Sequence, residues 1–63
     1  MSRITIYMSA GDAMHGIPVY ELTMPTNQAF AMLENSGFVP EGGGVYADLN
    51  TGTIATIETV KEV

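Results

Sequence analysis

Ser9, Asp12 and His15 follow one another at intervals of three residues, and they supply the three side-chain types of a serine-type catalytic triad. Asp12 and His15 lie in residues 10–16, a glycine-containing segment that we predict to be a loop. A triad is defined by where its side chains lie in space, and spacing along a loop does not fix those positions. We therefore expect no catalytic residues, and a small enzyme that uses Asp12 and His15 is only a remote alternative.

A second segment that could form a functional site is residues 41–44, in which Glu41 is followed by three glycines. Successive amide groups of a glycine-rich loop can line a phosphate site. Here no lysine follows the glycines, the segment precedes an expected strand, and the Glu41 carboxylate would repel an anion. We therefore predict that residues 40–44 form a flexible connector from a helix to a strand.

The composition excludes other kinds of site. The chain has no cysteine, so it can form neither disulfide bonds nor cysteine-based metal sites, and we expect no metal and no cofactor. Its 63 residues are close to the lower limit for a fold held by packing alone, and we expect one domain, residues 1–63. The N-terminal segment does not resemble a signal peptide, and no apolar run approaches the roughly 20 residues that span a bilayer, so we expect a cytoplasmic protein.

The N-terminal part of the chain has the pattern of two strands. Residues 3–9 alternate between apolar and polar side chains, with Ile4, Ile6 and Met8 on one side, which predicts a half-buried strand. Residues 17–22 resume an extended pattern, and Pro18 belongs at the start of a strand or on an edge because it cannot donate a ladder hydrogen bond.

Residues 27–36 are expected to form a helix of about three turns, because Ala29, Phe30 and Leu33 fall on one face at helical spacing. Thr23 or Thr26 can cap its N-terminus. Gly37 suits the left-handed position just past its C-terminus, with residue 38 folding back toward Leu33.

The C-terminal part is predicted to be a hairpin of residues 45–49 and 53–60, joined by the three-residue loop 50–52 with Gly52 in the left-handed region. This loop length places Ala47 opposite Ala55 and Val45 opposite Ile57.

The resulting fold class is α+β in the order ββαββ: a mainly antiparallel four-stranded sheet with one helix packed on one face. The expected buried residues are Ile4, Ile6, Met8, Ala29, Phe30, Leu33, Phe38, Val45, Ala47, Leu49, Ala55 and Ile57. The other face of the sheet stays open and displays Tyr7, Tyr46 and Ile54, with either Val19 or Tyr20 from the second strand.

The distribution of charge limits the choice of partner. Arg3 and Lys61 are the only Lys or Arg residues, whereas six of the seven carboxylates lie between them, and the net charge is −5. Such a surface repels phosphate, so nucleic acid and anionic membranes are excluded as ligands, and a basic surface of a larger protein is the expected partner.

The expected contact surface is the open sheet face, where carboxylates lie near exposed apolar side chains. We predict the following partner-binding residues: Tyr7, Glu21, Tyr46, Asp48, Ile54 and Glu58. Met32, on the outward flank of the helix, is added because methionine adapts to the shape of a partner; the helix face around it is the alternative interface.

Two functional hypotheses follow. In the first, the chain is a non-catalytic protein-interaction module and inhibitor that occupies a basic, nucleic-acid-binding surface. It is similar in size and charge to phage-encoded inhibitors such as anti-CRISPR proteins, some of which mimic nucleic acid, although no motif supports the analogy. In the second, it is an accessory or regulatory homodimer, formed through the open sheet face or the last strand.

Overall fold

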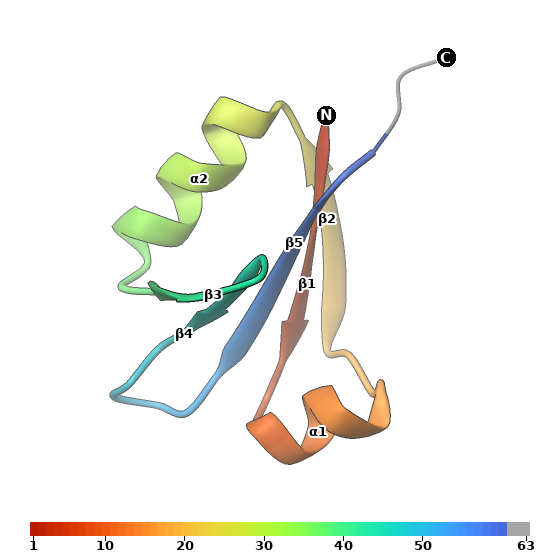
Figure 1. Ribbon diagram of the computed structural model, residues 1–63, viewed down its shortest axis with the longest axis vertical. Coiled ribbons are helices and arrows are strands. Elements are labelled where there is room, and N and C mark those ends of the chain that lie inside the picture. Colours follow the sequence, from red (N-terminus) through yellow and green to blue (C-terminus); the bar gives the residue numbers. More distant parts are fainter. Residues whose placement is uncertain (61–63) are drawn as a thin grey trace.

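The computed structural model describes residues 1–60 (Figure 1). Its elements in chain order are β1 (Ser2–Tyr7), α1 (Ala10–His15), β2 (Tyr20–Met24), α2 (Thr26–Asn35), β3 (Val39–Gly42), β4 (Val45–Ala47) and β5 (Ile54–Thr59). The α+β class is confirmed. Within residues 1–60 the structure has a five-stranded antiparallel sheet and two helices, where the sequence predicted four strands and one helix.

The strand order in the sheet is β2-β1-β5-β4-β3. The first and last strands are therefore neighbours at the centre, where Ile4 lies opposite Ile57 and Ile6 lies opposite Ala55. β5 is paired on both sides, with β1 and with β4. Residues 54–56 of β5 are thus paired on both sides, so a dimer through the last strand would have to form outside them.

Helix α1 occupies the segment that was predicted to be a loop. The hydroxyl of Ser9 caps its N-terminus by accepting from the Asp12 amide at 3.2 Å. At the other end the Gly16 amide donates to the Ala13 carbonyl at 3.2 Å, and the Ile17 amide donates to the Asp12 carbonyl at 3.0 Å. These two bonds form a Schellman motif, so both ends of this six-residue helix are closed by local hydrogen bonds.

Strand β3 replaces the predicted flexible connector. Val39 pairs with Ala47 and Pro40 pairs with Tyr46, and the register shifts before Gly42. Pro40 is tolerated because β3 is an edge strand, where no second neighbour needs its missing N–H group. A glycine turn then returns the chain into β4, and the Gly44 carbonyl accepts from the Ile57 amide of β5 at 2.8 Å.

The register of the last hairpin differs by one residue from the prediction. The Asp48 amide donates to the Thr53 carbonyl at 2.9 Å, which leaves four residues in the loop instead of three. As a result Ala47 lies opposite Ile54, and Tyr46 lies opposite Ala55. Because side chains alternate along a strand, this shift moves every β4 side chain to the opposite face.

Helix α2 begins after Pro25, and the structure shows no side-chain cap there, so neither Thr23 nor Thr26 has the predicted capping role. Instead, the Thr26 hydroxyl shares a 2.8 Å hydrogen bond with the hydroxyl of Ser2 in β1. The C-terminal end of α2 is as predicted: Gly37 has a positive φ, and the amide of residue 38 donates to the Leu33 carbonyl at 3.0 Å.

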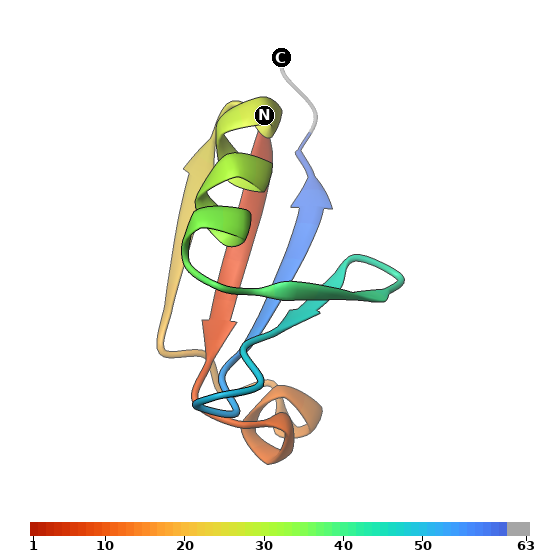
Figure 2. The ribbon, with the colours of Figure 1, turned by 90° about the vertical axis from the view of Figure 1, so that its left-hand side faces the viewer.

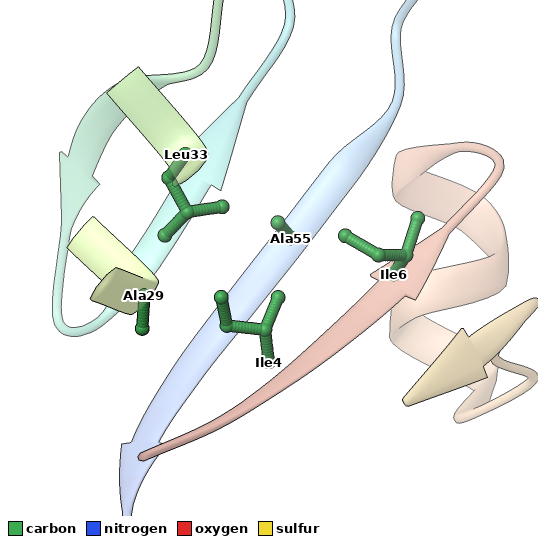
Figure 3. Close-up of a cluster of buried hydrophobic side chains, with 5 residues drawn as sticks. All are labelled: Ile4, Ile6, Ala29, Leu33 and Ala55. Atoms are coloured by element: carbon green, nitrogen blue, oxygen red, sulfur yellow. The ribbon is translucent and has the colours of Figure 1, made fainter. Parts of the chain in front are cut away.

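The core lies between α2 and the two central strands (Figure 3). Its residues are Ile4, Ile6, Ala29, Leu33 and Ala55, with Met24, Met32, Phe38, Tyr46 and Ile57 packed around them. Three residues that were predicted to be buried are exposed: Met8 at 66%, Phe30 at 46% and Leu49 at 77%. Met8 and Leu49 lie beyond the strand ends, and Val45 and Ala47 follow the register shift onto the face away from α2.

A single helix of this length cannot cover five strands. Ten residues of helix extend about 15 Å and are about 10 Å wide, whereas five strands span about 19 Å. Figure 2 shows α2 in front of β1 and β2, while β5 and the β3–β4 hairpin extend to one side of it. The helix-facing side of β3 and β4 is therefore only partly covered.

Candidate interaction surface

The open face of the sheet, which is the face away from α2, contains three of the predicted contact residues on its two central strands. Tyr7 and Ile54 lie directly opposite each other on β1 and β5. Glu58 lies on the same face, opposite Arg3. Tyr7 and Ile54 are half-buried, so this part of the face offers less free apolar area than the sequence predicted.

Glu58 is engaged within the chain. The Arg3 Nε donates to the Glu58 carboxylate at 2.6 Å, and a second guanidinium nitrogen of Arg3 contacts the same oxygen, forming a salt bridge across the two central strands. Both side chains are substantially exposed, so the pair adds little stability. Its main consequence is to neutralise the carboxylate that was expected to attract a basic partner.

The other predicted contact residues lie at separate places. Glu21 lies on the open face, opposite Thr5, but on the edge strand β2. Asp48 lies at the start of the last hairpin loop, where its carboxylate accepts from the Asn50 amide at 3.0 Å. Tyr46 lies on the helix side, which corrects its expected place on the open face. Met32 packs against the core from α2.

The series of Ser9, Asp12 and His15 lies in helix α1 and its N-terminal cap. The Ser9 hydroxyl accepts a hydrogen bond from the Asp12 backbone, which is the role of a helix cap. In residues 1–60 no hydrogen bond joins His15 to either Ser9 or the Asp12 carboxylate. The spacing of Ser9 and Asp12 is therefore explained by helix capping, in which His15 takes no part. The same part of the chain holds no group of three potential metal ligands.

A pocket of about 400 Å³ lies on the helix side, between the C-terminal half of α2 and the β3–β4 hairpin. We call it the aromatic pocket, and its lining residues are Phe30, Glu34, Phe38, Val39, Pro40 and Tyr46. Figure 1 shows how the chain leaves α2 and turns directly into β3 beneath it. Helix α2 covers one half of the sheet, and the pocket forms at the edge of the helix, where the sheet continues into β4 and β3.

Three local features place the aromatic side chains there. Phe30 and Glu34 are four residues apart on α2, so they share one side of the helix. The turn at Gly37 returns Phe38 toward the end of the helix. The one-residue register shift brings Tyr46 to the helix side, where its ring centre lies 6.5 Å from that of Phe30, at an interplanar angle of 53°.

The charge at the pocket is negative only. Glu34 is the only charged residue in its lining, and its side chain is exposed at the rim. The one Lys or Arg within residues 1–60 is Arg3, which is bound to Glu58 on the open face, on the other side of the sheet. No cation from this part of the chain therefore offsets the Glu34 carboxylate.

The sequence prediction placed Phe30 in the core and Tyr46 on the open face, and so it missed the aromatic pocket. A partial signal was present, because Phe30, Glu34 and residue 38 follow one another at intervals of four. This spacing indicates a common side of the helix and its exit. The contribution of Tyr46 depends on the hairpin register and could not be read from the helix pattern.

A second exposed apolar region lies along β2. This strand pairs with β1 only, so the backbone groups on its outer side have no strand neighbour within residues 1–60. Tyr20 and Leu22, and Val19 just before the strand, are exposed there. An edge strand of this kind is a potential site for pairing with another strand.

Comparisons of the chain with protein-family models, with curated protein sequences and with solved structures found no match. Neither helix within residues 1–60 has the length and apolar character needed to cross a membrane.

Proposed function

We propose that this chain is a non-catalytic acidic protein-interaction module that acts as an inhibitor by covering a basic surface of a larger protein, such as a nucleic-acid-binding surface. The observation that carries the proposal is the lack of internal charge compensation. Within residues 1–60 the Arg3–Glu58 pair is the only salt bridge, and it leaves Asp12, Glu21, Glu34, Glu41 and Asp48 without a basic partner.

Uncompensated charge of one sign acts at long range. It attracts a basic surface, raises the rate of encounter, and repels nucleic acid and anionic membranes. Steering alone gives little residence time, which requires apolar area at the contact. The exposed aromatic and aliphatic side chains around the aromatic pocket supply such area next to a carboxylate. The proposal therefore moves the favoured contact from the open face to the helix side.

Affinity capture at two salt concentrations tests the proposal. The tagged chain is incubated with cell lysate at about 0.05 M and 0.5 M salt, and bound proteins are identified by mass spectrometry. We expect one or a few basic proteins that are retained at low salt and lost at high salt, because screening is nearly complete within a few ångströms at the higher concentration. Each captured protein is then purified for binding measurements with the chain.

Two controls accompany the capture. A labelled DNA duplex and a labelled RNA should show no binding to the chain, because a protein with only two Lys or Arg residues and a net charge of −5 can release few counterions from phosphate. A duplex should compete with the chain for the captured protein if that protein's nucleic-acid site is covered. Capture that is unaffected by salt, or direct binding of the chain to nucleic acid, would contradict the proposal.

Self-association is the second candidate, and the exposed edge of β2 specifically favours it. Two copies could pair these strands and continue the sheet, with Tyr20 and Leu22 contributing apolar contacts. Sedimentation measurements at low and high salt test self-association. An apolar dimer should persist at high salt, whereas a chain that functions only as an acidic monomer should sediment as a monomer, most clearly at low salt, where its charges repel one another. A dimer that Leu22→Lys abolishes would establish the edge as its interface.

A further inference from the structure

The aromatic pocket combines aromatic rings with a carboxylate, and this chemistry selects a particular kind of occupant. Phe30 and Tyr46 present tilted rings, with Phe38 completing the aromatic lining and Glu34 at the rim. The faces of aromatic rings carry negative electrostatic potential and attract cations. An anion would be repelled both by the rings and by Glu34, and a purely apolar side chain would make no use of the carboxylate.

The chain does not fill this site with a cation of its own from residues 1–60, since Arg3 is bound to Glu58 on the opposite side of the sheet. The pocket is also too open to be part of the packed core, as the 46% exposure of Phe30 shows. Its volume of about 400 Å³ lies at the lower end of the range of ligand sites. That is enough for one long side chain and part of its backbone.

We infer that the aromatic pocket binds an arginine side chain of the basic partner. This inference rests on the proposed function and names the group that the module recognises. A guanidinium is planar, so it stacks on aromatic rings while its N–H groups donate to a carboxylate, here Glu34. A lysine ammonium is a compact and strongly hydrated charge, which gains less from a half-open aromatic site.

Nuclear magnetic resonance titration of the intact chain tests the inference with defined probes. The probe is arginine blocked at both ends, as N-acetyl-arginine methylamide. The matched controls are the citrulline compound, which has nearly the same shape but no charge, and the lysine compound. We expect arginine to shift the ring signals of Phe30 and Tyr46 and the backbone signal of Glu34, with an affinity above those of lysine and citrulline.

Two variants with matched controls locate the site. Glu34→Gln should weaken arginine binding about threefold, the size expected for an exposed ion pair, whereas Glu21→Gln removes one carboxylate from the other face and should have no effect. Phe30→Leu keeps apolar area but removes the ring, and should weaken binding about two- to fivefold. Tyr20→Leu removes an exposed ring from β2 and should leave the affinity unchanged. Unaltered spectra elsewhere in each variant establish that the fold is retained.

Equal binding of citrulline or lysine would overturn the assignment of arginine, and shifts confined to another surface would overturn the pocket. These failures differ from failure of the proposed function. If the captured basic partner binds Glu34→Gln and Phe30→Leu as tightly as the parent, the pocket inference is wrong, although the module still binds a basic protein. If the parent captures no salt-sensitive basic partner, the proposed function itself is wrong, whatever the titration shows.

Discussion

The carbonyl of Gly44 accepts a hydrogen bond from the amide of Ile57 at 2.8 Å, and this contact joins the glycine turn to the central strand β5. The two backbones are so close that a Cβ atom added at Gly44 would lie 2.8 Å from the Ile57 carbonyl oxygen. Gly44 also has a φ of 78°, a conformation that other residues rarely adopt. The position thus combines two separate requirements for glycine.

Gly44→Ala should destabilise the fold more than Gly43→Ala. Gly43 has a φ of 63°, but no atom lies within 4 Å of a Cβ built there, so its substitution costs only the backbone strain of about 1 to 2 kcal/mol. At Gly44 the hairpin must also move away from β5, and the loss of the hydrogen bond adds about 1 kcal/mol. Urea unfolding of both variants measures the difference. Equal free energies of unfolding would show that the close contact with Ile57 is unimportant.

Leu33→Ala should cost much more stability than Phe30→Ala. Leu33 is completely buried against β1 and β5, and its truncation is expected to cost about 2 to 5 kcal/mol, which can exceed the stability of so small a chain. Phe30 is half-exposed at the aromatic pocket, so we expect about 1 kcal/mol there. The sequence analysis placed both residues in the core, which would imply similar losses. Thermal unfolding monitored by circular dichroism gives the melting temperatures of both variants, and equal values would contradict the observed packing.

The hydrogen bond between the hydroxyls of Ser2 and Thr26 predicts that removing one hydroxyl destabilises the fold more than removing both. Ser2 is almost completely buried, and Thr26→Val removes its only side-chain partner, which should cost about 1 to 3 kcal/mol. Adding Ser2→Ala removes the unpaired hydroxyl as well, so the double variant should be more stable than Thr26→Val alone. Thr23→Val, at an exposed position in β2, is the control. A double variant that is less stable than Thr26→Val would show that the buried hydroxyl finds another partner.

The Ser9 cap should control helix α1 without controlling the sheet. A six-residue helix has little stability of its own, and Ser9→Ala removes the hydrogen bond to the Asp12 amide, at a cost of about 1 kcal/mol. Hydrogen exchange at the amides of Ala13 and Ile17 should then become faster, while exchange at Ile57 stays slow. Ser36→Ala, which changes an exposed serine at the end of α2, should alter none of these rates. Unchanged protection of Ala13 in Ser9→Ala would mean that tertiary contacts hold α1 in place.

The elements with strong local patterns could be predicted from the sequence, namely β1, β5 and α2 with its stop at Gly37. The α1 helix was missed because the glycines at positions 11 and 16 favoured a loop, whereas Gly16 is the left-handed residue that ends the helix. The orientation of β4 was wrong for a different reason. Loops of three and four residues are both compatible with this turn sequence, and a difference of one residue exchanges the two faces of the strand. The aromatic pocket depends on that choice, so the helix pattern alone could not reveal it.

The Arg3–Glu58 pair changes how charge reversal on the open face must be interpreted. Glu58→Lys places a second cation directly opposite Arg3, whereas Glu21→Lys makes the same change in net charge opposite Thr5. Like charges across strands repel, so we expect Glu58→Lys to be less stable than Glu21→Lys by about 0.5 to 1 kcal/mol in dilute buffer. The difference should shrink at high salt, because both side chains are exposed to solvent. Urea unfolding at two salt concentrations measures it. If the two variants are equally stable in dilute buffer, the salt bridge does not persist in solution, and Glu58 is then as free to meet a basic partner as the other carboxylates.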